Sequence, residues 1–362
     1  VNHGSLASQN IHYPVFSCYG TSYQSIHNHS IPLFSLFTAS PQAYAVNIYW
    51  GVNDIKVVNN NYRKQMQEAF ESPHDLLLSG EDIGLLNANE LLSFLKWLGD
   101  TGRQIIPFAC VRSPYAFHCS QVRQQVKDGV AMNYVGLCPQ RERLKHLKNV
   151  FGDELHFIPF AEACRHSLGP VGYLLAFCGV NPTSFELKRI GGGLNNDIVR
   201  LQNLLNHHQP RIKNGRLNKR YISINPCKGS RFFLRPEELK ELEDHLDFEN
   251  EALKVLLGEG FGDLERKTNE TYFSHAYPPL VYSLVAATAL RLQGYLEPPI
   301  NQISLSCVHR FLINEASENH LRQITDLDHN AVIGTSVELS TDPLDRFPMV
   351  INDLAHAFIN RE

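Results

Sequence analysis

The stretch that decides the fold is RQIIPFACVRSPYAFHCSQVRQQVKDG, residues 103–129. Its apolar part, residues 104–111, predicts a buried strand, because short continuous apolar runs are typical of strands covered on both faces. Arg112 follows this strand at once, and the helix predicted over 115–127 carries Ser120. The order strand, arginine, helix, serine predicts an α/β fold with polar chemistry at the carboxyl end of a strand.

Strand and helix patterns alternate on both sides of this stretch. Two further short apolar runs, at 75–82 and 155–160, predict strands. Apolar residues at helical spacing predict five more helices, over 87–100, 140–151, 170–178, 195–207 and 236–257. Residues 1–38 are polar and poorly periodic, so we expect loops and short pieces there. This alternation predicts a parallel sheet flanked by helices.

The length of 362 residues allows two structural units. The pattern changes after the glycine-rich break at 258–262. We therefore expect an α/β domain over residues 1–260 and a mixed C-terminal subdomain over 261–362, with an apolar helix at 277–295. The sequence indicates no role for this subdomain and no oligomeric state.

The overall charge and hydropathy exclude several classes of protein. The formal net charge is −4, which does not favour a general nucleic-acid binder. The best apolar stretch, residues 280–292, is too short to cross a bilayer, which takes roughly 20 residues. No signal peptide is recognisable. We expect neither a membrane span nor a nucleic-acid partner.

Cysteine and histidine spacing gives no support for a metal site. No two of the eight cysteines stand at CxxC spacing, and several lie inside apolar runs. Free thiols of this kind favour a reducing, cytoplasmic location. His27 and His29 could form a metal pair or supply a second base, but no carboxylate or cysteine stands nearby, so we interpret both as solvated loop residues.

Arg112 and Ser120 are candidates for holding a phosphate. A guanidinium offers a planar fork of donors, and a helix start offers free N–H groups and a positive dipole end. The alternative is a surface salt bridge for Arg112 and a helix-face position for Ser120. Lys127 could add positive charge, but the last turn of a helix is an ordinary place for lysine.

Glu81 is the candidate general base. It follows the apolar run 76–78 directly, in Ser79-Gly80-Glu81. If that strand neighbours the strand ending at Val111, Glu81 and Arg112 open into one crevice, where a carboxylate could accept a proton from a hydroxyl. The alternative is that Glu81 caps the helix beginning near Asn87 or pairs with a lysine.

A glycine-rich stretch at 191–193 stands before the helix predicted over 195–207. It looks like a phosphate cradle, but it follows no strand and lacks the Lys-Ser/Thr that a phosphate-binding loop needs. We interpret it as a flexible turn into a helix capped by Asn195 or Asn196.

Residues 103–129 resemble the sulfotransferase family. In that family an arginine at a strand end and a serine eight positions later form the 3′-phosphate site, and Arg112 and Ser120 match this pattern. The closer likeness is to a bacterial sulfotransferase-like group, in which a strand ending in Ser-x-Glu precedes R-x-P…S…Q-x-V-K-x-G. Here these are Ser79-Gly-Glu81 and residues 112–129. The resemblance covers roughly residues 5–265, and Arg112 with Ser120 is its specific motif.

The resemblance implies a fold like that of P-loop nucleotide-binding enzymes. It implies transfer of a sulfuryl group from 3′-phosphoadenosine 5′-phosphosulfate to a hydroxyl of a carbohydrate or other small acceptor, with no metal and with Glu81 as base. The family's first strand and its Gly-Thr/Lys-rich loop, which hold the 5′-phosphosulfate, are expected before Tyr13-Pro14, beyond Val1. No GxxxxGK[ST] occurs in the sequence, so the loop is either lost or changed beyond recognition.

Two other functions remain open from the sequence. A nucleotide-sugar glycosyltransferase could use a similar α/β frame, and Asp326-Leu327-Asp328 has the DxD spacing found in such enzymes. A non-catalytic member of the sulfotransferase group would keep the scaffold as a binding module. The glycosyltransferase would differ from a sulfotransferase in binding a sugar nucleotide. The binding module would differ in transferring no group at all.

Overall fold

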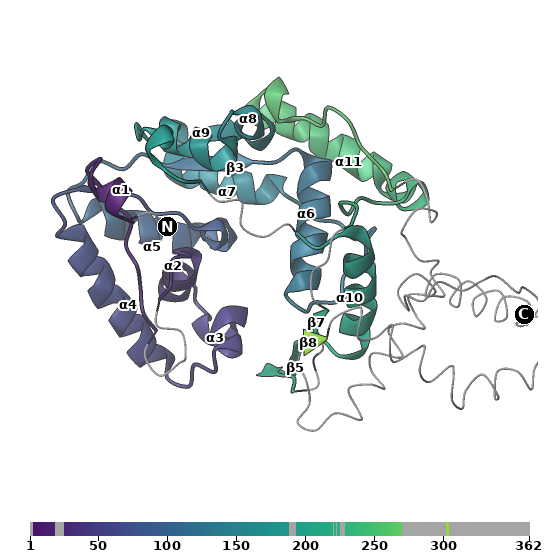
Figure 1. Cartoon of the computed structure of the whole chain (residues 1–362), viewed down its shortest axis with the longest axis horizontal. Helices are drawn as coiled ribbons and strands as arrows, with labels where there is room; N and C mark the ends of the chain where they lie inside the picture. The colour runs from purple at the N-terminus through teal and green to yellow at the C-terminus, as the bar shows by residue number, and fades with distance from the viewer. Residues whose placement is uncertain are drawn as a thin grey trace, which may run out of the picture.

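Small parallel sheets flanked by helices form the mixed α/β fold (Figure 1). The computed structural model describes residues 3–18, 25–187, 193–219, 221, 223–224 and 229–269, with the backbone of 302–303. Strand β1 (Ile11–His12) pairs in parallel with β2 (Asp75–Leu76). Strand β3 (Phe108–Val111) pairs in parallel with β4 (His156–Pro159). The α/β class and the parallel pairing agree with the sequence.

The strands are shorter than the apolar runs suggested. The run at 75–82 forms only the two residues of β2, and the run at 104–111 becomes a strand only at Phe108. Pro107 explains the late start of β3, because proline has no N–H to give to the ladder. Its carbonyl still accepts a hydrogen bond from the His156 N–H, at 3.0 Å.

The N-terminal third is mainly helical. Its helices are α1 (His3–Ala7), α2 (Ser30–Phe37), α3 (Ala45–Tyr49), α4 (Ile55–Phe70) and α5 (Ala88–Gly99). The expectation of loops and short pieces across 1–38 agrees with the described residues there, in which α1 has five residues and α2 has eight. Helix α2 is SIPLFSLF, in which even Ser30 and Ser35 are buried, so it has no polar face for a periodic pattern to reveal. Helix α5 begins with a capping box formed by Asn87 and Glu90.

The central helices are α6 (Pro114–Lys127), α7 (Arg141–Phe151), α8 (Phe160–Arg165) and α9 (Gly169–Phe177). Helices α6, α7 and α9 lie within one residue of the predicted bounds. Gly152 ends α7 with φ 66°, the left-handed conformation expected of a helix-terminating glycine. Helix α8 has only six residues, too few for a periodic signal.

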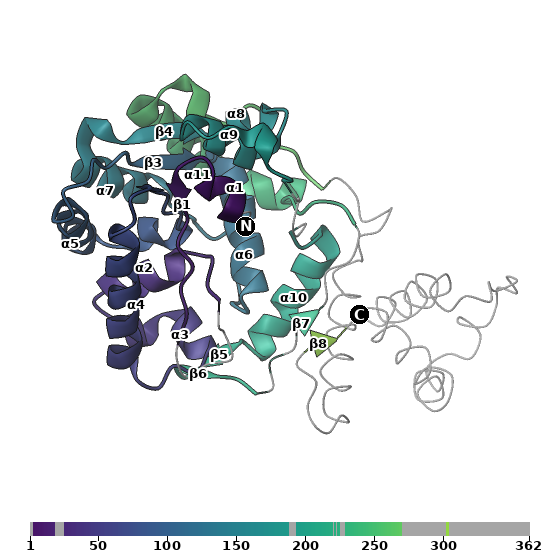
Figure 2. The ribbon, with the colours of Figure 1, turned by 60° about the vertical axis from the view of Figure 1, so that its left-hand side comes forward.

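Helices α10 (Asn196–His208) and α11 (Pro236–Leu257) pack beside α6, as Figures 1 and 2 show. Their shared core includes Val122, Ile198, Leu201 and Leu242. Asn195 is the N-cap of α10, and its side chain accepts a hydrogen bond from the Ile198 N–H at 2.9 Å. The predicted cap is thus confirmed at Asn195. The predicted turn at 191–193 stays a prediction, because residues 191 and 192 lie outside the described residues.

Two short strand pairs and five single turns complete the described elements. The strand pairs are an antiparallel hairpin, β5 (Ile212–Lys213) with β6 (Arg216–Leu217), and a parallel pair, β7 (Ser223–Ile224) with β8 (Gln302–Ile303). The 3₁₀ turns are η1 (Pro41–Ala43), η2 (Glu81–Leu85), η3 (Gly152–Glu154), η4 (Pro182–Ser184) and η5 (Glu259–Phe261).

Residues 261–269 pack against the α/β body. Phe261 is buried in the cluster that contains Val111 and Leu253, and the Asn269 N–H donates to the Leu234 carbonyl at 3.0 Å. The domain boundary near residue 260 stays a prediction. The expected helix at 277–295 and the DxD sequence at 326–328 lie outside the described residues. Among the helices that the structure describes, none combines the length and apolar character needed to cross a bilayer.

Candidate anion-binding site

Arg112 lies where two parallel strands end. It follows β3 directly, and its guanidinium carbon is 4.0 Å from the ring centroid of Phe160, the residue that follows β4. This stacking holds the guanidinium plane against the ring and leaves its N–H edges available for other partners. Within the described residues, Arg112 forms no ion pair. The expected alternative of a surface salt bridge is therefore not found there.

Glu81 lies close enough to Arg112 to act on it electrostatically. Burial lowers the pKa of Arg112, the carboxylate of Glu81 opposes this effect, and the nearby charge of Arg231 lowers the pKa further. Glu81 itself is exposed and begins η2. Asn87, rather than Glu81, caps α5. Strand β2 ends at Leu76 and pairs with β1, so in the described residues it is not the neighbour of β3 that the sequence analysis considered. Glu81 acts on Arg112 from η2 instead, and its role as a base stays a prediction.

Two further arginines join this site, and sequence reasoning missed both. Burial lowers the pKa of Arg123, and the charges of Arg231 and Arg112 lower it further. Arg112, Arg123 and Arg231 therefore form a group of mutually repelling cations, which we call the arginine cluster. Repulsion of this kind costs folding free energy unless an anion offsets it. Arg123 could have been found from the sequence, because it stands three residues after Ser120 on α6. Arg231 could not, because only the tertiary fold brings it near the other two arginines.

The chain around Arg231 and Arg123 is held in place by close backbone contacts. Arg231 pairs with Asn195 in an isolated antiparallel bridge, and the Asn196 N–H donates to the Ser230 carbonyl at 2.8 Å. Gly193 lies against Arg123: a Cβ at that position would be 2.5 Å from the guanidinium carbon. The Arg123 guanidinium therefore lies directly against the chain that leads into α10.

Ser120 lies halfway along α6 rather than at its start. It is half-buried, and its hydroxyl forms no hydrogen bond with any described residue. The expectation of free N–H groups at the helix start fails for Tyr115, because the Asp263 carboxylate accepts from its N–H at 3.1 Å. Ser120 and Arg123 share a face of α6 by their spacing. Ser120 stays a predicted phosphate ligand on that basis alone.

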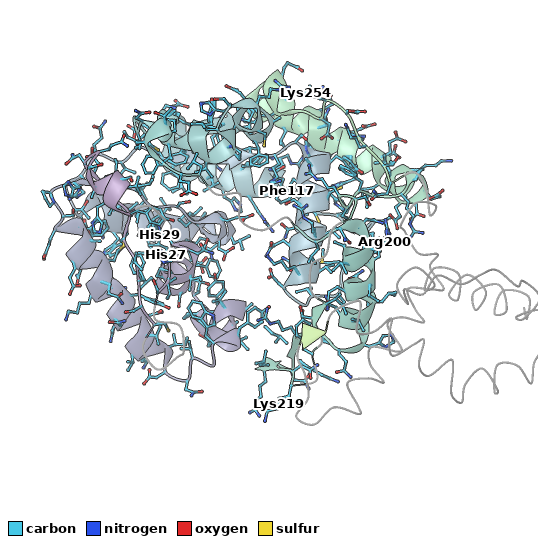
Figure 3. The ribbon with its side chains drawn as sticks, in the orientation of Figure 1. His27, His29, Phe117, Arg200, Lys219 and Lys254 are labelled. Atoms are coloured by element: carbon cyan, nitrogen blue, oxygen red, sulfur yellow. The ribbon has the colours of Figure 1, made fainter. Side chains whose placement is uncertain are left out.

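His29 is a structural residue, and its interpretation as a solvated loop residue is wrong. It is fully buried; its Nε2 lies 2.8 Å from the Pro14 carbonyl, and its Nδ1 accepts from the Ser79 N–H at 2.9 Å. These two bonds fit the neutral imidazole with its proton on Nε2. His29 thereby ties residue 14 to the chain just before Glu81. His27, labelled beside it in Figure 3, is exposed as expected.

Lys127 is exposed in the last turn of α6, in agreement with the ordinary position considered for it. In the described ranges, no three histidine, cysteine or acidic side chains lie together in a way that could hold a metal ion.

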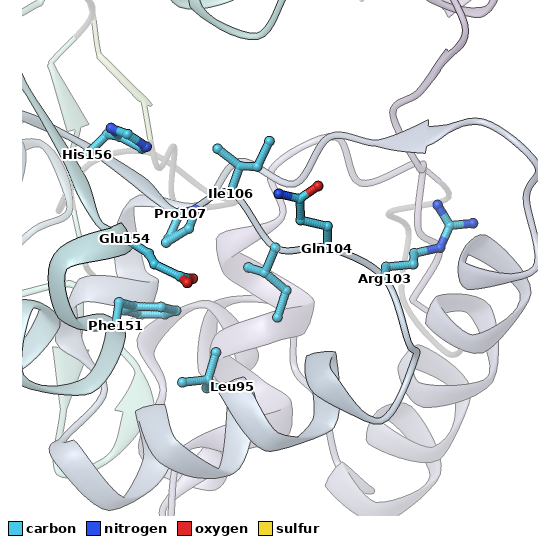
Figure 4. Close-up of a pocket in the computed structure, with 9 residues that line it drawn as sticks. Leu95, Arg103, Gln104, Ile106, Pro107, Phe151, Glu154 and His156 are labelled. Atoms are coloured by element: carbon cyan, nitrogen blue, oxygen red, sulfur yellow. The ribbon is translucent and has the colours of Figure 1, made fainter.

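A pocket of about 500 Å³ lies at the opposite, amino ends of β3 and β4 (Figure 4). Pro107, His156 and Glu154 line it. Its arginine, Arg103, points away from Phe151 and donates to the carbonyls of His74 and Phe70, each at 2.9 Å. Arg103 therefore links the chain that leads into β3 to the carbonyls of Phe70 and His74. The pocket lining holds no other arginine or lysine that could bind an anion.

The geometry supports one kind of chemistry best. Three guanidinium groups that hydrogen-bond to none of the described residues can hold a multiply charged anion such as a phosphate, and a neighbouring carboxylate can accept a proton. Asp263 holds the start of α6, and His29 holds the chain at Ser79, just before η2. No family model, curated protein or solved structure matches this chain.

Proposed function

We propose that the chain belongs to a sulfotransferase-like transferase with the fold of P-loop nucleotide-binding enzymes. In this proposal it binds 3′-phosphoadenosine 5′-phosphosulfate and transfers the sulfuryl group to a hydroxyl of a carbohydrate. The observation that carries the proposal is Arg112, stacked on Phe160 at the carboxyl ends of β3 and β4. Glu81, Arg123 and Arg231 lie close enough to interact with it electrostatically.

The residues of the cluster fit the 3′-phosphate of this co-substrate. A phosphate monoester carries close to two negative charges at neutral pH and offers three acceptor oxygens. Arg112, Arg123 and Arg231 together offer more charge than Glu81 can neutralise, so a dianion balances the site. Stacking on Phe160 orients the donor edges of Arg112. In this proposal Ser120, which shares a face of α6 with Arg123 by its spacing, adds a hydroxyl.

The roles of the side chains follow from their charges. The cluster binds and orients the nucleotide, which supplies the sulfuryl group when bound. Glu81 accepts the proton of the acceptor hydroxyl as that oxygen attacks sulfur, and the adenosine bisphosphate leaves with the bonding electron pair. The exposed position of Glu81 is consistent with contact to an acceptor entering from solvent.

Binding of adenosine 3′,5′-bisphosphate, measured by calorimetry, tests the phosphate site. We expect saturable binding to the unaltered chain and a loss of at least about tenfold in affinity for Arg112→Ala, since a charge-assisted hydrogen bond contributes about 1.5–3 kcal/mol. Arg123→Ala should weaken binding in the same direction. Arg63→Ala, at an exposed arginine of α4, is the matched control and should bind as the unaltered chain does.

The same titration separates the alternative functions. Saturable binding of UDP- or GDP-sugars without bisphosphate binding would select the glycosyltransferase. Bisphosphate binding with no sulfuryl transfer to any carbohydrate would select the non-catalytic binding module. Glu81→Gln should retain bisphosphate binding and lose sulfuryl transfer. If Glu81→Gln and the unaltered chain transfer the sulfuryl group equally well, Glu81 is not the base.

A further inference from the structure

Two exposed thiols stand close in sequence to the two residues of the Arg112–Phe160 stacking contact. Cys110 lies on β3, two residues before Arg112, and Cys164 lies on α8, four residues after Phe160. Both thiols are free and exposed, whereas Cys119 of α6 is buried. The proposed transfer uses neither Cys110 nor Cys164, so their placement beside the site calls for a separate explanation.

Strand alternation places Cys110 on the face of the sheet that α9 packs against. Ala109 and Val111 belong to the core cluster on the other face, which includes residues of α7 and α11. The ring centroid of Phe108 lies 5.4 Å from that of Phe177 in α9. Because side chains two residues apart in a strand point to the same face, Cys110 shares this face with Phe108. Helices α8 and α9 lie beside β3 and β4 on the ribbon (Figure 2).

Helix α8 brings Cys164 to the same place. It begins directly after β4 and contacts that strand. Phe160 and Cys164 are four residues apart, so they share a face of α8, with about 5–6 Å between their Cβ atoms. The step from Arg112 back to Cys110 along β3 is similar, about 7 Å. Since Phe160 lies against Arg112, these spacings bring the two thiols together beside the stacking contact.

The electrostatic interactions of these groups agree with this placement. Partial burial raises the pKa of Cys110 to about 11; the charge of Arg112 opposes this effect and that of Cys164 adds to it. Burial lowers the pKa of Arg112, whereas the charges of Cys164 and Cys110 act to raise it. Cys164 and Cys110 therefore lie within electrostatic range of each other and of Arg112.

Two exposed thiols in this arrangement can undergo thiol–disulfide exchange. The thiolate is the attacking form, and the raised pKa keeps Cys110 protonated at neutral pH, so Cys164 attacks first. Its sulfur bonds to one sulfur of oxidised glutathione, and the other glutathione leaves as a thiolate. The Cys110 sulfur then gives up its proton, attacks the Cys164 sulfur and releases the second glutathione thiolate. Two electrons pass from the protein to oxidised glutathione, and the released thiolates take up the two protons.

We propose that Cys110 and Cys164 form a redox-active pair that closes to a reversible disulfide between β3 and α8, with a small disulfide such as oxidised glutathione as the oxidant. The cross-link fixes α8 on β3 and holds the Phe160 ring against Arg112. A guanidinium held in place loses less freedom when it binds an anion, so oxidation tightens anion binding. This effect on binding rests on the proposed function, whereas the disulfide itself does not.

Peptide mapping by mass spectrometry tests the disulfide, after the folded full chain has been incubated in glutathione buffers of increasing oxidised fraction. The Cys110–Cys164 cross-link should appear before any other and disappear in dithiothreitol. In Cys110→Ser, Cys164 should stop at the mixed disulfide with glutathione, and Cys164→Ser should form no cross-link. Cys138→Ser, which removes a half-buried thiol elsewhere, is the control and should cross-link as the unaltered chain does.

Three results would overturn the redox-active pair. They are the absence of the cross-link at every buffer composition, the joining of Cys110 or Cys164 to a different cysteine of the chain first, and a cross-link that forms only in urea-unfolded protein.

Calorimetry with adenosine 3′,5′-bisphosphate, on oxidised and reduced protein, tests the effect on Arg112. Oxidation should raise the affinity of the unaltered chain about threefold or more. The affinity of Cys110→Ser/Cys164→Ser should be the same in both buffers. Equal affinities of the oxidised and reduced unaltered chain would overturn the effect on Arg112.

The two measurements also separate this proposal from the proposed function. If the cross-link forms and the bisphosphate binds neither form, the disulfide stands, and the effect on binding fails together with the sulfotransferase proposal. If the bisphosphate binds through Arg112 and no cross-link forms, the sulfotransferase proposal stands and the redox-active pair fails.

Discussion

Arg200 and Arg112 place the same side chain in opposite surroundings. Arg200 is buried between α10 and α11; its Nε donates to the Asn196 side chain, and its terminal nitrogens donate to both oxygens of Glu238 at 2.9 and 3.1 Å. Arg112 has the Phe160 ring beneath it, two other arginines near it and one carboxylate within electrostatic range. The first guanidinium has its donors satisfied by the fold, whereas the second keeps donors for something else.

In our proposal, this difference separates a charge that stabilises the fold from a charge that binds a ligand. A buried, fully bonded pair is costly to break because the remaining partner loses both its solvent and its counter-charge. A cluster of like charges costs stability in the free protein, and such costs gather at functional sites. Disrupting the Arg200 pair should therefore lower stability, whereas substituting Arg112 should weaken ligand binding.

Glu238→Gln should give the largest effect, a loss of about 3–5 kcal/mol in the free energy of unfolding, because it leaves Arg200 buried without its counter-charge. Urea denaturation measures this loss. Burial alone would raise the pKa of Glu238, but the bonds and charge of Arg200 outweigh burial and lower it. The stability that this carboxylate contributes is thus present above its unfolded pKa and lost as pH falls through the folded value.

The exposed Glu243 of the same helix provides the control. Glu243→Gln should change stability by less than about 0.5 kcal/mol. The stability of Glu238→Gln should lose the acid dependence described above. The free energies of unfolding of the unaltered chain and of Glu238→Gln should therefore converge at low pH. If Glu238→Gln lowers the free energy of unfolding by less than about 1 kcal/mol at pH 7, the Arg200–Glu238 pair does not stabilise the fold as we expect.

Arg112→Met should act on ligand binding instead of stability. Removing one of three like charges should leave the free energy of unfolding unchanged or slightly higher. The stabilisation by adenosine 3′,5′-bisphosphate, about 2.7 kcal/mol at a concentration of 100 times its dissociation constant, should be lost. Thermal denaturation with and without the bisphosphate measures both quantities. A large destabilisation without ligand would place Arg112 with Arg200 as a structural residue.

Local sequence signals predicted much of the helical part of this fold. Gly152 ends α7, Asn195 caps α10 and Pro236 begins α11, and each acts through its own backbone geometry. The placement of Arg112 at a strand end was predictable for a similar reason, since an apolar run stops at Val111. Features that depend on one residue and its immediate neighbours can be predicted in this way.

Features that depend on distant segments could not be predicted. Arg231 reaches the site only because its segment pairs with Asn195. The N–H groups at the start of α6 look free in the sequence, but Asp263, from 148 residues further along the chain, accepts from Tyr115. His29 looks like a loop histidine until Pro14 and Ser79 close around it. The sequence therefore predicted one arginine of the site and missed the two that define its charge.

Asp128→Asn examines a third charge environment, intermediate between the two arginines. Burial raises the pKa of Asp128, while hydrogen bonds from Gln124 and the charges of Lys127 and Arg211 oppose this. Asp128 is also the C-cap of α6, where a negative charge is unfavourable. The neutral variant should be more stable at pH 7 by about 0.3–1 kcal/mol.

The pH dependence gives the sign of this effect. Because the folded pKa of Asp128 is raised, the charged form destabilises the fold increasingly as pH rises from the unfolded pKa through the folded value. The advantage of Asp128→Asn should therefore appear over that interval and vanish at lower pH. An advantage that persists in acid would come from packing or hydrogen bonding rather than from charge.

Lys213→Thr should give the smallest effect and extends the comparison to the surface. The Lys213–Arg216 pair of the β5–β6 hairpin opposes like charges across two strands, as the arginine cluster does inside the molecule. Threonine removes the repulsion and favours strand geometry, so the free energy of unfolding should rise by about 0.2–1 kcal/mol. High salt should erase the electrostatic part of this gain, because salt screens exposed charges. Lys219→Thr, outside the paired positions of the hairpin, should show a smaller gain, and an equal gain there would assign the effect to net charge rather than to the opposed pair.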